Sequence, residues 1–151
     1  MSKFKPGDQA PAFSGKDQSG NMVSLESFRG SKVVLYFYPK DDTPGCTAEA
    51  CSLRDNYEAL LARGYKVVGV SPDSEKSHQK FTEKYELPFP LIADTGKNIL
   101  QDYGVWGRKK FMGREYDGVI RTTFVIDEKG IIEEVIEKVD TKNHAAQVLK
   151  G

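Results

Sequence analysis

The chain has 151 residues, of which 38% are hydrophobic and 11% aromatic, and its 22 basic and 22 acidic side chains cancel at pH 7. This length and composition predict one domain, spanning residues 1–151, that can bury a sizeable core. Long blocks of like charge are missing and no apolar run approaches the ~20 residues of a membrane span, so the sequence argues against nucleic-acid partners and membrane insertion.

The first part of the chain predicts a small hairpin followed by a strand–helix–strand unit. The N-terminal stretch suggests two short strands that turn at Gly20–Asn21. Lys32–Tyr38 is a continuous run of β-branched and aromatic residues, which is typical of a buried strand. Thr47–Gly64 has apolar residues at helical spacing and ends at a glycine, and Tyr65–Ser71 is a second buried strand. Because a helix connects the two strands, we expect them to be parallel.

The second part of the chain predicts shorter elements. These are an amphipathic helix at Ser74–Leu87, a short strand at Phe89–Asp94, a short helix at Gly96–Gly104, a loop at Val105–Gly118, a hairpin at Val119–Lys138 and a short helix at Thr141–Lys150. The loop prediction depends on three glycines and on mixed polarity.

This order of elements predicts an α/β architecture in which helices flank a central mixed β-sheet. It matches a thioredoxin-like fold with an N-terminal β extension. In open sheets of this kind, functional sites form at the carboxyl ends of parallel strands. The segment Pro39–Cys46 follows the first central strand at that end, so we expect the site there.

Cys46 lies where the polar loop gives way to the predicted helix. The N–H groups and dipole of a helix N-terminus favour an anion, so a cysteine there is expected to favour the thiolate, which is the nucleophile. The alternative is a small core residue with no reactivity. The polar residues just before Cys46 argue against its burial and favour the reactive interpretation.

Cys46 and Cys51 are the two cysteines of the chain. On one regular helix their Cα atoms would be about 8–9 Å apart, with side chains pointing about 140° apart around the axis. A disulfide needs Cα atoms within roughly 4.4–6.8 Å, so the pair can bond only if the start of the helix unwinds. One hypothesis is that Cys46 becomes a sulfenic acid that Cys51 resolves; the alternative is that Cys51 never reacts.

The stretch from Pro39 to Cys46, "PKDDTPGC", resembles the P-x-x-x-T-x-x-C signature of peroxiredoxins, and Glu49 also fits the family pattern. Cys51, five residues after Cys46, resembles the bacterioferritin comigratory protein (peroxiredoxin Q) subfamily. "DGVIRTTFVIDEKG" is similar to the family's segment that carries the active-site arginine, here Arg121. The resemblance covers nearly the whole chain.

The resemblance implies a role for each of these residues. Cys46 would be the peroxidatic cysteine and Cys51 the resolving cysteine. The Thr43 hydroxyl would contact the thiolate and the peroxide oxygens, although a threonine there can also be an ordinary helix cap. Arg121 would place its guanidinium beside the thiolate and stabilise the charge that develops as the O–O bond breaks, whereas an arginine in a strand usually faces solvent.

Two further residues carry supporting roles by the same resemblance. Pro39 would shield the thiolate from water, and it would also end the strand. Glu49 would orient an arginine, but a glutamate in the first turns of a helix is also favoured by the helix dipole.

The resemblance implies a peroxidase that reduces hydrogen peroxide and organic hydroperoxides without a metal or organic cofactor. A thioredoxin-like protein would be its reductant. An intramolecular disulfide needs no second chain, so we expect a monomer. Two cysteines cannot make the disulfide framework of a secreted protein, and the first residues lack a signal peptide's apolar run, so we expect a cytoplasmic location.

Two competing interpretations stay open at this point. A thiol–disulfide oxidoreductase would share the fold but favours C-x-x-C spacing. A metal-binding or chaperone-like module would use the histidines, but His78 and His144 lie on predicted polar helices, where we expect exposed rings without function.

The sequence predicts that the basic stretch Gly107–Glu115 is a solvated loop. Trp106 is predicted to be part of the core or an anchor of that loop.

Overall fold

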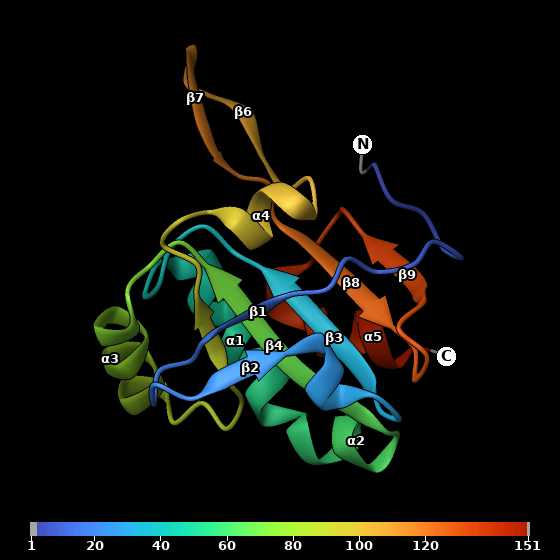
Figure 1. Cartoon of the computed structure of the whole chain (residues 1–151). Coiled ribbons are helices and arrows are strands. Elements are labelled where there is room, and N and C mark those ends of the chain that lie inside the picture. Colours follow the sequence, from blue (N-terminus) through green and yellow to red (C-terminus); the bar gives the residue numbers. More distant parts are fainter. Residues whose placement is uncertain (1–2, 151) are drawn as a thin grey trace.

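The computed structural model describes residues 3–150, and its centre is a five-stranded mixed β-sheet (Figure 1). The strand order is β5-β4-β3-β8-β9. Its strands are β3 (Lys32–Phe37), β4 (Tyr65–Ser71), β5 (Leu91–Ala93), β8 (Thr122–Ile126) and β9 (Ile132–Ile136). β3 pairs in parallel with β4, and β4 with β5, whereas β8 is antiparallel to both of its neighbours. The predicted mixed sheet, parallel unit and closing hairpin are confirmed.

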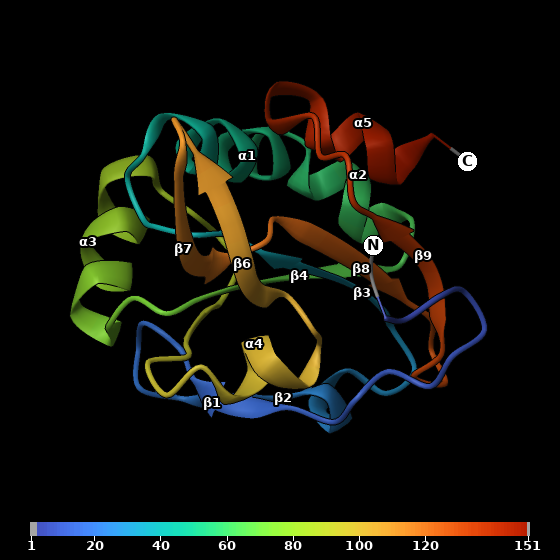
Figure 2. The same cartoon turned by 90° about the horizontal axis from the view of Figure 1, so that it is seen from above.

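Two layers cover the faces of this sheet, as the view along its edge shows (Figure 2). One layer holds the helices α1 (Pro44–Asp55), α2 (Tyr57–Ala62), α3 (Glu75–Tyr85) and α5 (His144–Leu149). The other holds α4 (Asn98–Asp102) and the predicted N-terminal extension, β1 (Ser14–Lys16) and β2 (Met22–Ser24), which pair antiparallel. Short 3-10 turns occur at Leu25–Phe28 and Thr141–Asn143.

The core lies on both faces of the sheet, because side chains along a strand alternate in direction. Along β3, Val33, Leu35 and Phe37 belong to one buried cluster, whereas Val34 and Tyr36 belong to the other. This strand is buried on both sides, which explains its unbroken apolar sequence.

The predicted helix Thr47–Gly64 is wrong in its bounds, because the structure has two helices that meet at Asn56. The Asn56 backbone leaves helical geometry, with φ −112° and ψ 16°, and its side chain donates to the Ser52 carbonyl at 2.8 Å. Asparagine competes for backbone groups in this way and so interrupts helices. The first helix also begins earlier than predicted, at Pro44.

The predicted loop Val105–Gly118 is also wrong. It forms the hairpin of β6 (Trp106–Phe111) and β7 (Arg114–Val119), which projects from the body of the molecule (Figure 1). Its two-residue turn is Met112–Gly113, and both residues have positive φ, as a tight hairpin turn requires. Most of β7 is exposed, so the apolar alternation of a half-buried strand is missing from its sequence.

The remaining predicted elements are confirmed within a few residues. They are the N-terminal hairpin, the helix α3, the short strand β5, the short helix α4 and the closing helix α5. In the described part of the chain, no helix combines the length and apolar character that a bilayer span needs.

Candidate active site

The candidate site lies at the carboxyl end of β3, where a short loop leads into α1. Thr43 is the residue before the helix and Pro44 is the first residue in it, a position where the missing N–H of proline does no harm. Cys46 therefore lies in the first turn, where N–H groups and the helix dipole favour an anion. This agrees with the predicted position of the site.

The Cys46 side chain is buried, with 1% of the residue exposed. Our expectation that the polar loop keeps this thiol exposed is wrong. Cys46 belongs to the apolar cluster that also contains Tyr36, Ala50 and Leu53, so the helix turns its side chain toward the sheet. Packing therefore fixes the position of the sulfur.

Arg121 supplies the polar side of the thiol environment. It lies between β7 and β8, and its side chain is only 22% exposed. Nη2 donates to Cys46 Sγ at 3.3 Å, and Nη1 donates to Glu49 Oε1 at 2.6 Å. One guanidinium thus bridges the sulfur and a carboxylate one turn further along α1. The arrangement can stabilise negative charge on the sulfur and on an oxygen bound beside it.

Glu49 is fully buried behind Arg121. Its Oε1 accepts from Arg121, and its Oε2 lies 3.4 Å from His144 Nε2. Burial raises the pKa of Glu49 to about 7, although the positive charge of Arg121 opposes this shift. The carboxyl group is therefore placed to titrate near neutral pH.

Thr43 and Pro39 lie in the loop that carries the site. Thr43 makes no capping hydrogen bond to the helix; its hydroxyl donates to the Lys40 carbonyl at 2.9 Å. This bond uses the hydroxyl proton and leaves the oxygen lone pairs as acceptors. Pro39 is half-buried and lies two residues after the end of β3.

Cys51 lies on the same helix as Cys46, and both thiols are free. Cys51 is half-buried and follows Cys46 by five residues. The helical spacing therefore holds the sulfurs apart while α1 is intact.

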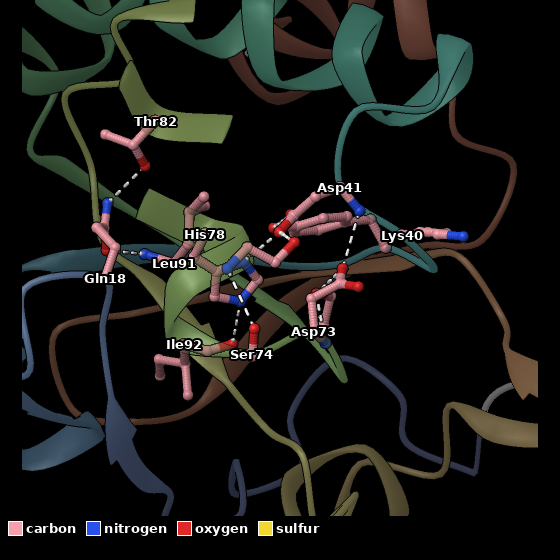
Figure 3. A network of polar contacts seen from close by, with 12 residues as sticks. Gln18, Lys40, Asp41, Asp73, Ser74, His78, Thr82, Leu91 and Ile92 are labelled. Atoms are coloured by element: carbon pink, nitrogen blue, oxygen red, sulfur yellow. Dashed lines mark hydrogen bonds and ion pairs between the residues drawn. The ribbon is translucent and has the colours of Figure 1, made fainter. Parts of the chain in front are cut away.

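Asp41 is the centre of a network that fastens the active-site loop to α3 (Figure 3). Its carboxylate accepts from the Tyr38 hydroxyl at 2.6 Å and from the Ser77 hydroxyl at 2.8 Å. His78 Nδ1 lies 2.7 Å from the same carboxylate, and His78 Nε2 lies 3.0 Å from the Ile92 carbonyl oxygen. These contacts hold the loop against the helix and the sheet.

The same region contains the one group of potential metal ligands among the described residues, Asp41, Asp73 and His78, with ligand atoms within 4.8 Å of one another. Asp73 Oδ2 accepts from the Asp41 N–H and from the Ser71 hydroxyl, both at 2.8 Å. Because these atoms already satisfy one another, we interpret the group as a hydrogen-bond network that positions the loop.

The expectation that His78 and His144 are exposed is wrong, because both rings are fully buried. His78 lies one turn before the buried Phe81 on α3, and His144 lies one turn before the buried Val148 on α5. Each histidine is therefore on the inward face of its helix. This spacing is the sequence signal that could have identified them.

Replacing His78 with glutamine (His78→Gln) is expected to lower the free energy of unfolding by about 3 kcal/mol, because loss of one partner of a buried pair leaves the Asp41 carboxylate underpaired. Urea unfolding followed by circular dichroism measures this loss. The matched control is Lys84→Gln, which removes an exposed ion pair between α3 and Asp42 of the same loop and should change little. Equal losses in both variants would contradict the anchoring role.

Of the six predicted site residues, the structure joins Cys46, Glu49 and Arg121 by direct contacts. Sequence reasoning missed two neighbours. His144 contacts Glu49, and the buried hydroxyl of Tyr36 has no hydrogen-bond partner among the described residues. Tyr36 lies within an apolar strand, and this sequence context predicts a core residue instead of a site residue.

The chain is similar to known proteins over most of its length. A family model described as "AhpC/TSA family" matches residues 6–135. "Putative peroxiredoxin bcp" of Coxiella burnetii is 48% identical over 143 residues, 95% of this chain and 95% of that protein. "Peroxiredoxin Bcp" of Escherichia coli K12 is 46% identical over 149 residues, 99% of this chain and 96% of that protein. The solved structure of a Xylella fastidiosa PrxQ mutant has a TM-score of 0.92 at 29% identity and covers 99% of this chain and 96% of its own.

Proposed function

We propose that Cys46 is the residue that reduces the peroxide in this chain, which belongs to the AhpC/TSA family, in its peroxiredoxin Q branch, and is a thiol-dependent peroxidase. The observation that carries this proposal is the guanidinium of Arg121, which donates to Cys46 Sγ and to Glu49 Oε1 together. A fixed positive charge beside a sulfur at a helix N-terminus favours the nucleophilic thiolate. Glu49 orients the guanidinium.

In the first step the Cys46 thiolate attacks one peroxide oxygen, and the O–O bond breaks. The sulfur becomes a sulfenic acid, and the other oxygen leaves with the bonding electron pair and takes a proton to give water or an alcohol. Arg121 and the first-turn N–H groups stabilise the charge on the leaving oxygen. The Thr43 hydroxyl orients the peroxide, and Pro39 excludes water from the sulfur. This chemistry needs no metal or organic cofactor.

In the second step Cys51 attacks the sulfenic sulfur, which forms a disulfide and releases water. The first turns of α1 must unwind for this step, since the helix otherwise holds the two sulfurs apart. A thioredoxin-like protein then exchanges its dithiol with the disulfide and restores both cysteines. In this scheme the protein is an atypical two-cysteine enzyme, and one domain of residues 1–151 works as a monomer in the cytoplasm.

The experiment that tests this function is mass spectrometry of the reduced protein after one equivalent of hydrogen peroxide, with peptide mapping. We expect a fast loss of about two mass units that maps to a Cys46–Cys51 bridge, since a disulfide lacks both thiol hydrogens. If both thiols stayed free, the assignment of the reacting cysteines would fail.

A further inference from the structure

The carboxyl group of Glu49 has one satisfied oxygen and one unsatisfied oxygen. Oε1 accepts from Arg121, whereas Oε2 is buried without a hydrogen-bond partner among the described residues. His144 Nε2 lies 3.4 Å from this oxygen. An unpaired carboxylate oxygen in the interior is costly, so the protonation of these two groups needs an explanation.

The hydrogen bonds of Gln147 fix which nitrogen of His144 carries a proton. Gln147 Oε1 accepts from the Asp140 N–H at 2.9 Å, and Gln147 Nε2 donates to the Lys138 carbonyl at 3.0 Å. The amide is therefore oriented with its oxygen toward His144 Nδ1, 2.8 Å away. Because that oxygen can only accept, His144 Nδ1 is a donor.

His144 Nε2 consequently carries a lone pair when the ring is neutral. It lies 2.8 Å from Thr123 Oγ1 and 3.4 Å from Glu49 Oε2, and either the Thr123 hydroxyl or a protonated Glu49 can donate to its one lone pair. A neutral ring and an ionised carboxylate would then present lone pairs to each other inside the protein. One proton between the two groups removes this conflict.

We propose that Glu49 and His144 share one buried proton, and that His144 is thereby a positioning residue that sets the charge presented to Arg121 and Cys46. The proposal rests on the proposed function of Cys46. It adds a residue from α5, at the far end of the sequence, to the chemistry of the first helix.

The charged groups around Glu49 agree with this assignment. It faces Arg121 from the segment before β8, Tyr36 from β3 and His144 from α5, and Arg121 links it to Cys46 on its own helix. Burial raises the pKa of Glu49 to about 7 against the effect of Arg121. The proton therefore lies on Glu49 at and below neutral pH.

The surroundings of His144 favour the same location. Burial lowers the pKa of His144, and the Arg121 charge acts in the same direction. The Gln147 hydrogen bond and the charges of Asp140 and Glu134 oppose this shift without reversing it. The neutral ring then accepts a hydrogen bond at Nε2 from the Glu49 carboxylic acid, which keeps the proton.

This shared proton changes the charge next to the thiolate. While Glu49 is protonated, the positive charge of Arg121 acts on Cys46 without compensation. When the proton is lost above about pH 7, the negative charge of the carboxylate offsets the positive charge of Arg121 beside the sulfur. The peroxide reaction of Cys46 is expected to slow several-fold across this titration.

Infrared spectroscopy of the reduced full-length protein tests the proposal without peroxide. We expect a carbonyl band of a protonated carboxylic acid that disappears with a midpoint near pH 7 and is absent from Glu49→Gln. His144→Gln should lower the midpoint by about one pH unit or more, because its amide N–H can donate to Oε2 and stabilise the carboxylate. If His144→Gln fails to fold by circular dichroism, His144→Asn replaces it.

The matched control is His78→Gln, the same change at the other buried histidine, whose ring contacts Asp41 and Ile92. It should leave the midpoint of the Glu49 band in place. Absence of a band that depends on Glu49, or an equal shift in the His78 and His144 variants, would overturn the proposal. Stopped-flow oxidation should then show a step near pH 7 in the wild type that Glu49→Gln lacks. If Cys46 proved not to be the residue that reduces peroxide, the infrared result would still stand. Failure of the proposed function and failure of the shared-proton proposal are therefore distinguishable.

Discussion

Replacing Cys46 with serine (Cys46→Ser) is expected to abolish peroxide turnover, with a loss of at least about 10⁴-fold in kcat, as removal of a nucleophile costs in other enzymes. A serine hydroxyl fits the same buried position and can still accept from Arg121. It does not ionise near neutral pH, however, and its oxygen cannot form the sulfenic acid on which the cycle depends. A coupled assay with a thioredoxin system and hydrogen peroxide measures the loss.

The control for this variant is a test that it folds as the wild type does. Circular dichroism and urea unfolding should stay close to wild type, because the substitution changes one atom and keeps the polar contact with Arg121. Near-normal activity in both Cys46→Ser and Cys51→Ser would contradict the assignment of both cysteines.

The parts of the fold that could be predicted are those where burial and chain direction leave a strong pattern. β3 and β4 are buried on both faces along most of their length, so Val33–Phe37 and Val67–Val70 contain no charged residue. The hairpin of β6 and β7 gave no such pattern, because its strands project into solvent and its turn is Met112–Gly113 instead of the favoured Asn-Gly.

The candidate site also has parts that the sequence predicts and parts that it does not. Cys46, Glu49 and Arg121 could be predicted, since a signature after a strand marks the helix start and Arg121 directly precedes β8, the strand that pairs with β3. The burial of Cys46 could not be predicted, because the polar residues before a helix do not determine which way the side chains of its first turn point. The pairing of His144 with Glu49 joins residues 95 positions apart, and the sequence of a six-residue helix does not indicate which distant residue it contacts.

Replacing Cys51 with serine (Cys51→Ser) is expected to separate the two halves of the cycle. The rate constant for the first oxidation of Cys46 should stay within about twofold of wild type, because Cys51 makes no contribution to the Arg121 and Glu49 contacts around the sulfur. Steady-state turnover with a thioredoxin system should fall by about tenfold or more, since the sulfenic acid then lacks its internal thiol. Trapping with a sulfenic-acid reagent should label Cys46 in this variant.

The same variant tests whether disulfide formation opens the helix. Glu49 lies between the two cysteines, so any unwinding that brings Cys51 to Cys46 must pull Glu49 away from Arg121 and His144. Hydrogen exchange should therefore show lost protection across residues 44–51 in wild type after one equivalent of peroxide, and retained protection in oxidised Cys51→Ser. Wild-type turnover by Cys51→Ser, or an unchanged exchange pattern in the oxidised wild type, would mean that an outside thiol resolves Cys46 while α1 stays folded.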